Sequence, residues 1–141
     1  MTIRSARSAK NALVALVAAV MLVTVAAGCG GGGGGGGEAA ATAMLTPTVQ
    51  DGVQVFGVVG QADLTFSARE LVASPGRIRV DFSVAKGSAP HNFVISQLPG
   101  ASTDILSTGE SQTITFTATE PGEYPVICTL HPAMTATLVV R

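Results

Sequence analysis

Apolar and polar residues alternate strictly along residues 77–84, the clearest pattern in the chain. Its apolar positions are Ile78, Val80, Phe82 and Val84, and its polar positions are Arg77, Arg79, Asp81 and Ser83. Side chains on a strand point to opposite faces in turn, so this alternation predicts a strand with one buried face and one solvated face.

Shorter segments with the same kind of pattern follow one another through the rest of the chain. They are residues 53–59, 64–66, 91–95, 113–118, 124–128 and 135–140. Turn-forming residues separate them, as in Ser74-Pro75-Gly76 and in the Glu-Pro-Gly-Glu segment 120–123. No stretch has apolar residues at helical spacing over a useful length. The pattern predicts an all-β domain over residues 45–141, a Greek-key β-sandwich of about seven or eight strands.

The first 28 residues have the order of regions found in a secretory signal peptide. Three basic residues come first, the apolar run 12–23 follows, and small residues occupy positions 26–28. A retained transmembrane helix is the alternative, but a span needs about 20 apolar residues and this run is shorter. We therefore expect residues 1–28 to be a signal peptide and the protein to be exported.

Cys29 directly follows Ala26-Ala27-Gly28, and this segment resembles the lipobox of bacterial lipoproteins. The resemblance implies that Cys29 is acylated, although Ala26 stands where Leu is usual. The alternative is an ordinary cleavage site followed by a free thiol, which is a liability in an oxidising compartment. We expect a lipid anchor on the extracytoplasmic side of the membrane, in the periplasm or at the cell surface.

Residues 29–44 predict a flexible tether behind that anchor. An unbroken glycine run occupies positions 30–37, and small residues continue it to position 43. A glycine-rich coil of this length spans on the order of 20 Å. Such a tether would let the domain reorient at a membrane surface, or it could be a spacer whose length does not matter.

The charge balance disfavours nucleic acid as a partner. The whole chain has a net charge of −1, and loss of residues 1–28 leaves five basic residues against nine acidic ones, or about −4. Nucleic-acid binding requires a basic stripe. A mildly acidic chain suits a basic partner surface or simply remains soluble as a monomer, which we expect here.

One loop contains a thiol, an imidazole and a thioether in the spacing C-x2-H-x2-M. These are Cys128, His131 and Met134, directly after a predicted strand. Thiolate, imidazole and a weak axial thioether favour copper, and the blue-copper arrangement needs a second imidazole. His91 is the only other histidine of the chain. Each residue alone would more often be structural, but the combination predicts a metal site at one end of the sandwich.

The segments 90–93 and 120–134 resemble those of cupredoxins, and the loop is similar to the short loop of amicyanin-like members rather than the longer plastocyanin loop. The resemblance covers residues 50–141. It implies one copper ion with His91, Cys128 and His131 in the equatorial plane and Met134 as the long axial contact.

The same resemblance implies roles for the residues around the ligands. Asn92 would hydrogen-bond toward Thr129, next to the cysteine. His131 would reach solvent through an apolar patch and act as the electron port. The patch consists of Leu130, Pro132 and Ala133. Ordinary loop packing is the alternative explanation for these apolar residues.

A site with four protein ligands has no open position for substrate, so the pattern indicates an electron carrier rather than an enzyme. We expect one-electron exchange with redox proteins of the membrane or periplasm. Copper trafficking or storage is the alternative, although the chain has no methionine-rich or histidine-rich tract. Structural zinc prefers Cys and His without a thioether, and oxidase or reductase fragments would need further histidines.

Overall fold

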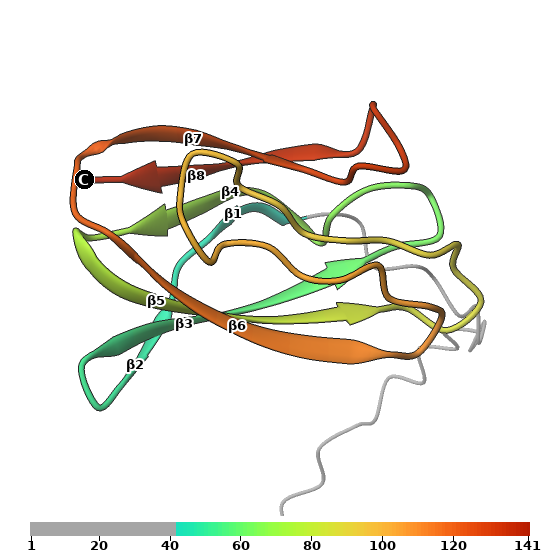
Figure 1. Cartoon of the computed structure of the whole chain (residues 1–141), viewed down its shortest axis with the longest axis horizontal. Helices are drawn as coiled ribbons and strands as arrows, with labels where there is room; N and C mark the ends of the chain where they lie inside the picture. The colour runs from blue at the N-terminus through green and yellow to red at the C-terminus, as the bar shows by residue number, and fades with distance from the viewer. Residues whose placement is uncertain (1–41) are drawn as a thin grey trace, which may run out of the picture. The chain divides into compact units, whose positions relative to one another are not determined.

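The computed structural model describes residues 42–141, which form two four-stranded sheets packed face to face (Figure 1). The strands are β1 (Thr42–Leu45), β2 (Thr48–Gln50), β3 (Val53–Gly60), β4 (Ala68–Ala73), β5 (Gly76–Val84), β6 (Ser111–Ala118), β7 (Gly122–Ile127) and β8 (Thr135–Val140). One sheet has the order β1-β4-β8-β7 and the other the order β2-β3-β5-β6. The predicted all-β Greek-key sandwich is confirmed.

The chain crosses between the two sheets several times, and some strands that become neighbours in this way are parallel. The chain passes from β3 to β4 in the other sheet and returns to β5, so that β3 and β5 pair in parallel. The pairs β1–β4 and β4–β8 are also parallel, whereas β5–β6 and β7–β8 are antiparallel. As a result, β3 and β5 end at the same end of the sandwich, next to the segment that contains His91.

The core lies between the sheets and follows the predicted alternation. Ile78, Val80 and Phe82 of β5 are fully buried. Phe82 also contacts Phe66 and Phe93, with the three ring centroids 5.9–6.1 Å apart. Inclined rings at this spacing stabilise a core beyond their buried area.

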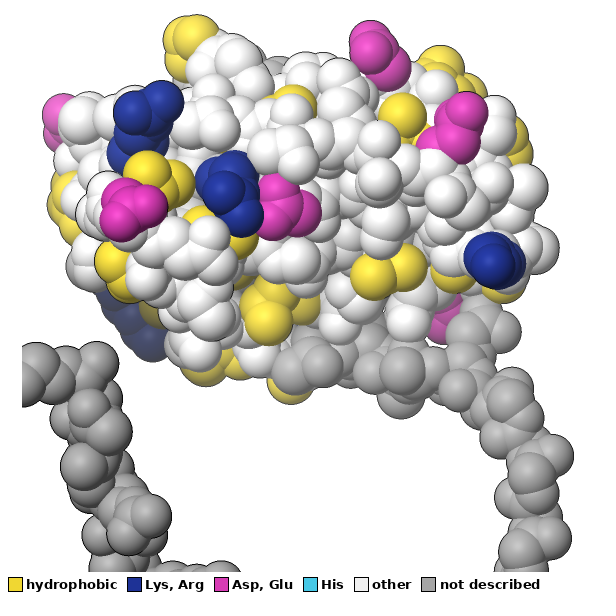
Figure 2. All heavy atoms as spheres, turned by 90° about the horizontal axis from the view of Figure 1, so that it is seen from below, with side chains coloured by type: hydrophobic (Ala, Val, Ile, Leu, Met, Phe, Trp, Pro, Cys, Tyr) yellow, Lys and Arg dark blue, Asp and Glu magenta, His cyan; other side chains and the backbone are white. Residues whose placement is uncertain are grey.

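The polar residues of β5 lie on the outer face of the β2-β3-β5-β6 sheet. Arg79 and Asp81 form an ion pair of 3.1 Å there. Figure 2, which shows this side of the domain from below, has basic and acidic side chains interspersed among hydrophobic and other residues. Solvated residues of both signs are typical of the exposed face of a sandwich.

Two segments expected to be strands have other structures. The segment 64–66 belongs to a tight loop, because the Leu64 N–H donates to Gln61 O and Leu64 takes a φ of 61°. The segment 91–95 makes only isolated bridges, in which Val94 pairs with both Ser102 and Ile127. Conversely, β4 was not predicted, since its segment Ala-Arg-Glu-Leu-Val-Ala has no strict alternation.

The first described strand begins before the domain boundary predicted at residue 45. Strand β1 starts at Thr42, within the range predicted as tether, and pairs in parallel with β4. Leu45 packs partly buried against the core, which accounts for the pairing of this short strand. The predicted signal peptide, Cys29 and the glycine run lie outside the described residues. Between residues 42 and 141, no helix is long and apolar enough to cross a membrane.

Candidate metal centre

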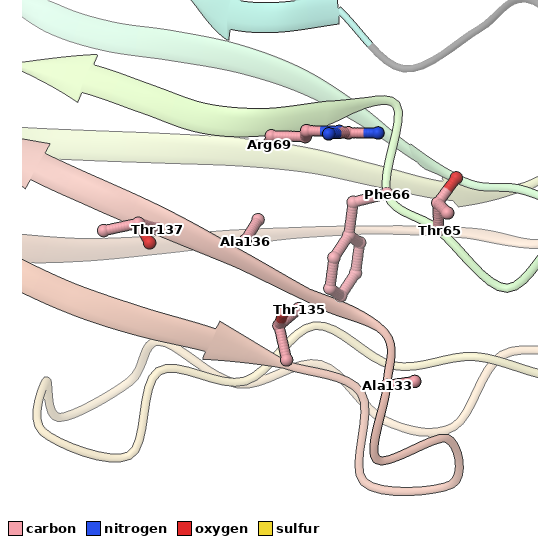
Figure 3. A pocket seen from close by; sticks show the side chains of 7 residues that line it. All are labelled: Thr65, Phe66, Arg69, Ala133, Thr135, Ala136 and Thr137. Carbon is pink, nitrogen blue, oxygen red and sulfur yellow. The ribbon is translucent and has the colours of Figure 1, made fainter.

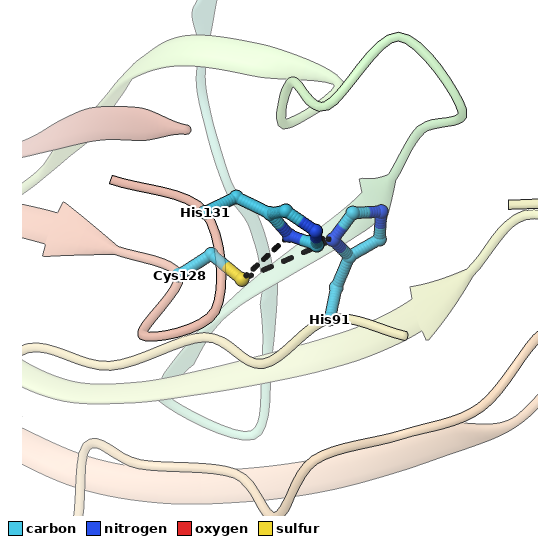
Figure 4. Close-up of side chains that lie close together, drawn as sticks. All are labelled: His91, Cys128 and His131. Atoms are coloured by element: carbon cyan, nitrogen blue, oxygen red, sulfur yellow. Dashed lines mark hydrogen bonds between the residues drawn. The ribbon is translucent and has the colours of Figure 1, made fainter. Parts of the chain in front are cut away.

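Three potential ligand atoms converge at one end of the sandwich (Figure 4). The Nδ1 atoms of His91 and His131 lie 3.2 Å apart. The Sγ atom of Cys128 lies 3.9 Å from Nδ1 of His91 and 3.6 Å from Nδ1 of His131. The cluster is the one group of three or more His, Cys, Asp or Glu ligands found within residues 42–141.

The fold brings these residues together through a pair of backbone hydrogen bonds. Val94 and Ile127 each donate an N–H to the other's carbonyl, at 3.1 and 3.0 Å. This bridge holds the segment that contains His91 against the end of β7, and Cys128 is the next residue of the chain. Leu106 fixes the other side of the segment, because its backbone exchanges two hydrogen bonds with that of His91.

His91 is fully buried and is held in one tautomer. Its Nε2 lies 3.0 Å from the carbonyl oxygen of Gln61 and 2.8 Å from Oγ of Ser88. A carbonyl only accepts hydrogen bonds, so Nε2 is protonated and the lone pair of the neutral ring is on Nδ1. That lone pair faces Cys128. A second hydrogen bond that fixes the ring in this way is typical of metal-ligating histidines.

Burial lowers the pKa of His91 below its usual value of 6.5. The hydrogen bond to Gln61 acts in the opposite direction, and the nearby His131 lowers the pKa further. The net effect favours the neutral imidazole, which is the form that binds a metal.

The loop from Cys128 to Met134 is closed by three backbone hydrogen bonds. His131 N donates to Cys128 O at 3.4 Å, Met134 N to His131 O at 2.9 Å, and Cys128 N to Met134 O at 3.1 Å. Cys128 and Met134 are 2% and 0% exposed, and His131 is partly exposed. The loop therefore buries both sulfur ligands and leaves one imidazole near the surface.

Asn92 and Thr129 connect the two ligand-bearing segments. The Asn92 amide Nδ2 donates to Thr129 Oγ1 at 2.9 Å, and the Thr129 backbone N–H donates to Asn92 Oδ1 at 2.8 Å. The family resemblance implied hydrogen bonding from Asn92 toward Thr129, without naming the atoms. The two bonds join the neighbour of His91 to the neighbour of Cys128.

The residues expected to surround an electron port are at the surface. Leu130 is 44% exposed, and Pro132 and Ala133 are exposed as well. Ala133 also lines a hollow of about 370 Å³ beside the loop from Cys128 to Met134 (Figure 3). The other residues of this hollow are Thr65, Phe66, Arg69, Thr135, Ala136 and Thr137. They include no thiol or imidazole, so the hollow is not itself a transition-metal site.

The residues present fit copper. Two imidazole nitrogens and one sulfur face one another, and a buried thioether closes the same loop. Two histidines, one cysteine and one methionine form the donor set of a type 1 copper site. No carboxylate belongs to the cluster, which disfavours the harder cations that prefer oxygen ligands.

The two groups within hydrogen-bond distance of Nε2 of His91 were not predicted from the sequence. The Gln61 acceptor is a backbone carbonyl, which any residue type would supply, and it lies 30 positions away in the chain. Ser88 was visible as part of the segment before His91, but a serine beside two small residues and a proline looks like any other loop residue. No local sequence pattern indicates that Gln61 or Ser88 contacts His91.

Comparison with known proteins identifies a matching family model and several solved structures with the same fold. The family model for the cupredoxin-like domain matches residues 13–140. Auracyanin A, a "blue" copper protein from Chloroflexus aurantiacus, matches with a TM-score of 0.56 and 20% identity, over 64% of this chain and all of that one. Auracyanin from Roseiflexus castenholzii gives 0.54 and 22%, over 62% of this chain and 96% of that one.

A third structure with the same fold comes from a different kind of protein. The metal-binding domain of the Cu(I)-exporting P-type ATPase of Streptococcus pneumoniae matches with a TM-score of 0.59 and 17% identity, over 71% of this chain and 97% of that one. No curated protein matches the sequence. The family model covers most of the chain, and the chain therefore belongs to the cupredoxin-like domain family.

Proposed function

We propose that the protein is a type 1 copper protein that carries one electron at a time between redox proteins, and that it is not an enzyme. The observation that carries this proposal is the closed donor set. Two of the three clustered ligands, His91 and Cys128, are buried, and so is the methionine that ends the loop. Catalytic metal sites keep a position open for water or substrate, and four protein ligands leave none.

The surrounding hydrogen bonds support electron transfer because they hold the ligands still. The Gln61 carbonyl and the Ser88 hydroxyl fix His91, and the Asn92–Thr129 pair fixes the cysteine side. When bound, copper supplies the Cu(I)/Cu(II) couple, whose potential depends on the axial ligand and on the surroundings of the cysteine sulfur.

We assign the exchange of electrons to the surface around His131. Its ring is the one ligand with partial exposure, and Leu130, Pro132 and Ala133 flank it. Exposed apolar residues grouped on a surface mark docking sites. A partner docked there would be close to the metal without displacing a ligand.

The location that fits this role is the outer face of the cytoplasmic membrane or the periplasm. The order of regions in residues 1–28 and the cysteine that follows support export and acylation at Cys29. A glycine-rich tether would then keep a monomeric carrier at the membrane surface, near redox proteins of the membrane or periplasm.

Copper trafficking is the second candidate, because the metal-binding domain of a Cu(I) exporter has the same fold. At 17% identity, this likeness concerns the fold alone. Trafficking requires that the metal leave readily, whereas buried ligands fixed by several hydrogen bonds favour retention. The two candidates therefore predict opposite rates of copper release.

The test is voltammetry of the copper-loaded chain from residue 29 onward, with Cys29→Ser to prevent oxidation at that position, followed by challenge with a Cu(I) chelator. A carrier gives a reversible one-electron wave and releases copper slowly. Rapid transfer of copper to the chelator, without a reversible wave, would support trafficking and contradict the proposal.

A further inference from the structure

Gly60, the last residue of β3, lies directly against the ring of His91. A Cβ atom built on Gly60 would be 2.8 Å from Cδ2 of His91 and 3.1 Å from both its Cβ and its Cγ. The backbone of Gly60 does not have the positive φ that would itself require glycine. A larger residue would not fit at position 60, because the side chain of His91, a proposed metal ligand, occupies the space.

The His91 ring cannot easily move away from an added methyl group. It is fully buried, and its Nε2 is within hydrogen-bond distance of Gln61 O and Ser88 Oγ. Its backbone exchanges two hydrogen bonds with Leu106, at 3.0 and 2.8 Å. A displaced ring would have to give up at least one of these contacts.

Gly60 is equally constrained. It pairs with Val84 in the ladder between β3 and β5, and its carbonyl accepts the N–H of Ala85 at 2.9 Å. Both sides of the contact are fixed, so an added Cβ would be accommodated mainly by rotation of the imidazole. Such a rotation changes the position of Nδ1 relative to Sγ of Cys128, now 3.9 Å away.

We propose that Gly60 is a positioning residue for the metal centre: its missing side chain determines where the His91 ring lies and hence where its Nδ1 atom is presented. The expected effects on copper affinity and on the copper spectra rest on the proposed function as a type 1 copper protein. The packing basis of the inference does not, because the contact between Gly60 and the side chain of His91 involves no metal atom.

The chain provides a matched control in the same strand. Gly57 is exposed on β3, and a Cβ added there would meet nothing within 4 Å. Gly57→Ala should leave the site unchanged and should leave stability equal or slightly higher, because alanine reduces the freedom of the unfolded chain.

The experiment compares wild type, Gly60→Ala and Gly57→Ala in Cu(I) affinity, by chelator competition, and in the visible and EPR spectra of the Cu(II) form. For Gly60→Ala we expect an affinity about 10–100-fold lower, the range for residues that orient metal ligands, and an altered charge-transfer band. Gly57→Ala should match wild type. Equal affinities and spectra for Gly60→Ala and wild type would overturn the proposal.

A double-mutant cycle on the metal-free protein tests the same contact independently of copper. Gly60→Ala should lower the Tm in the wild-type background, and most of this loss should disappear in His91→Ala, which lacks Cγ and Cδ2. An equal loss in both backgrounds would show that Gly60 serves the fold rather than His91. If no variant, wild type included, forms a coloured copper complex, the proposed function fails while this cycle still tests Gly60.

Discussion

The carbonyl oxygen of Gln61 lies 3.0 Å from Nε2 of His91, so the loop after β3 determines which nitrogen of this imidazole is protonated. A fixed tautomer directs the lone pair of Nδ1 toward Cys128 before any metal arrives. Ser88 Oγ approaches the same Nε2 at 2.8 Å. The metal centre is therefore preorganised on the side of His91 by one backbone group and one side chain.

Ser88→Ala tests the side-chain part of this arrangement. The hydroxyl is lost and the Gln61 carbonyl remains, so we expect a folded protein with a cost of about 1 kcal/mol. Cu(I) affinity should fall about 10-fold, at the low end for residues that orient ligands. Chelator competition measures the affinity, and Ser83→Ala on the outer face of β5 is the control. An affinity equal to that of the control would mean that the Gln61 carbonyl alone is enough to orient the His91 ring.

Asn92→Ala should destabilise the site more than Thr129→Val does. Loss of Asn92 removes both hydrogen bonds to Thr129 and leaves the Thr129 backbone N–H without its partner. The expected cost is about 1–3 kcal/mol, with faster loss of copper. Thr129→Val removes only the bond to Oγ1, so its cost should be smaller. Denaturant unfolding of the metal-free forms gives the order, and a reversed order would contradict this account.

The metal-free protein should lose stability as the pH falls below about 6.5. The unfolded chain binds a proton at His91 near the usual pKa of 6.5, whereas burial lowers the pKa of His91 in the folded state. The unfolded state therefore binds more protons in this window, and the free energy of unfolding decreases with falling pH. This contribution is complete above 6.5 and is lost progressively toward the folded-state pKa.

Urea unfolding between about pH 7.5 and 5.5 measures this slope, above the range in which most carboxylates titrate. His91→Gln should flatten it, because glutamine does not titrate. A slope that is the same in His91→Gln would assign the effect to another group.

The structural features that could be predicted from the sequence are those that depend on residues close together in the chain. Residues 77–84 form a strand as predicted because strict alternation is a local property that matches a half-buried strand. Cys128, His131 and Met134 are close in sequence, so their loop was visible directly. His91 could be added because the chain has only two histidines.

Features that depend on tertiary contacts could not be read in this way. The segment 64–66 alternates like a strand, yet a loop closed on Gln61 keeps it out of the sheets. Strand β4 exists because β1 and β8 pair with it on both sides, not because its own sequence requires it. The role of Gly60 likewise depends on a ring that reaches it from a distant part of the chain.

Anchoring at Cys29 predicts a simple fractionation result. In the full-length protein expressed in a bacterium, Cys29→Ala should abolish incorporation of labelled fatty acid and release the protein from the membrane fraction. Cys128→Ser, which changes the other cysteine, should lose copper but remain in the membrane fraction. Retention of Cys29→Ala in the membrane would mean that the N-terminal segment is held there by other means.

The most direct test of the central claim is the visible spectrum of the chain from residue 29 onward after addition of Cu(II). A type 1 site predicts an intense thiolate-to-copper charge-transfer band, hence a blue protein, and Cys128→Ser should abolish the colour without unfolding the domain. A folded wild-type protein that stays colourless with Cu(II) and binds only zinc would contradict the assignment of His91, Cys128, His131 and Met134 as a blue-copper site.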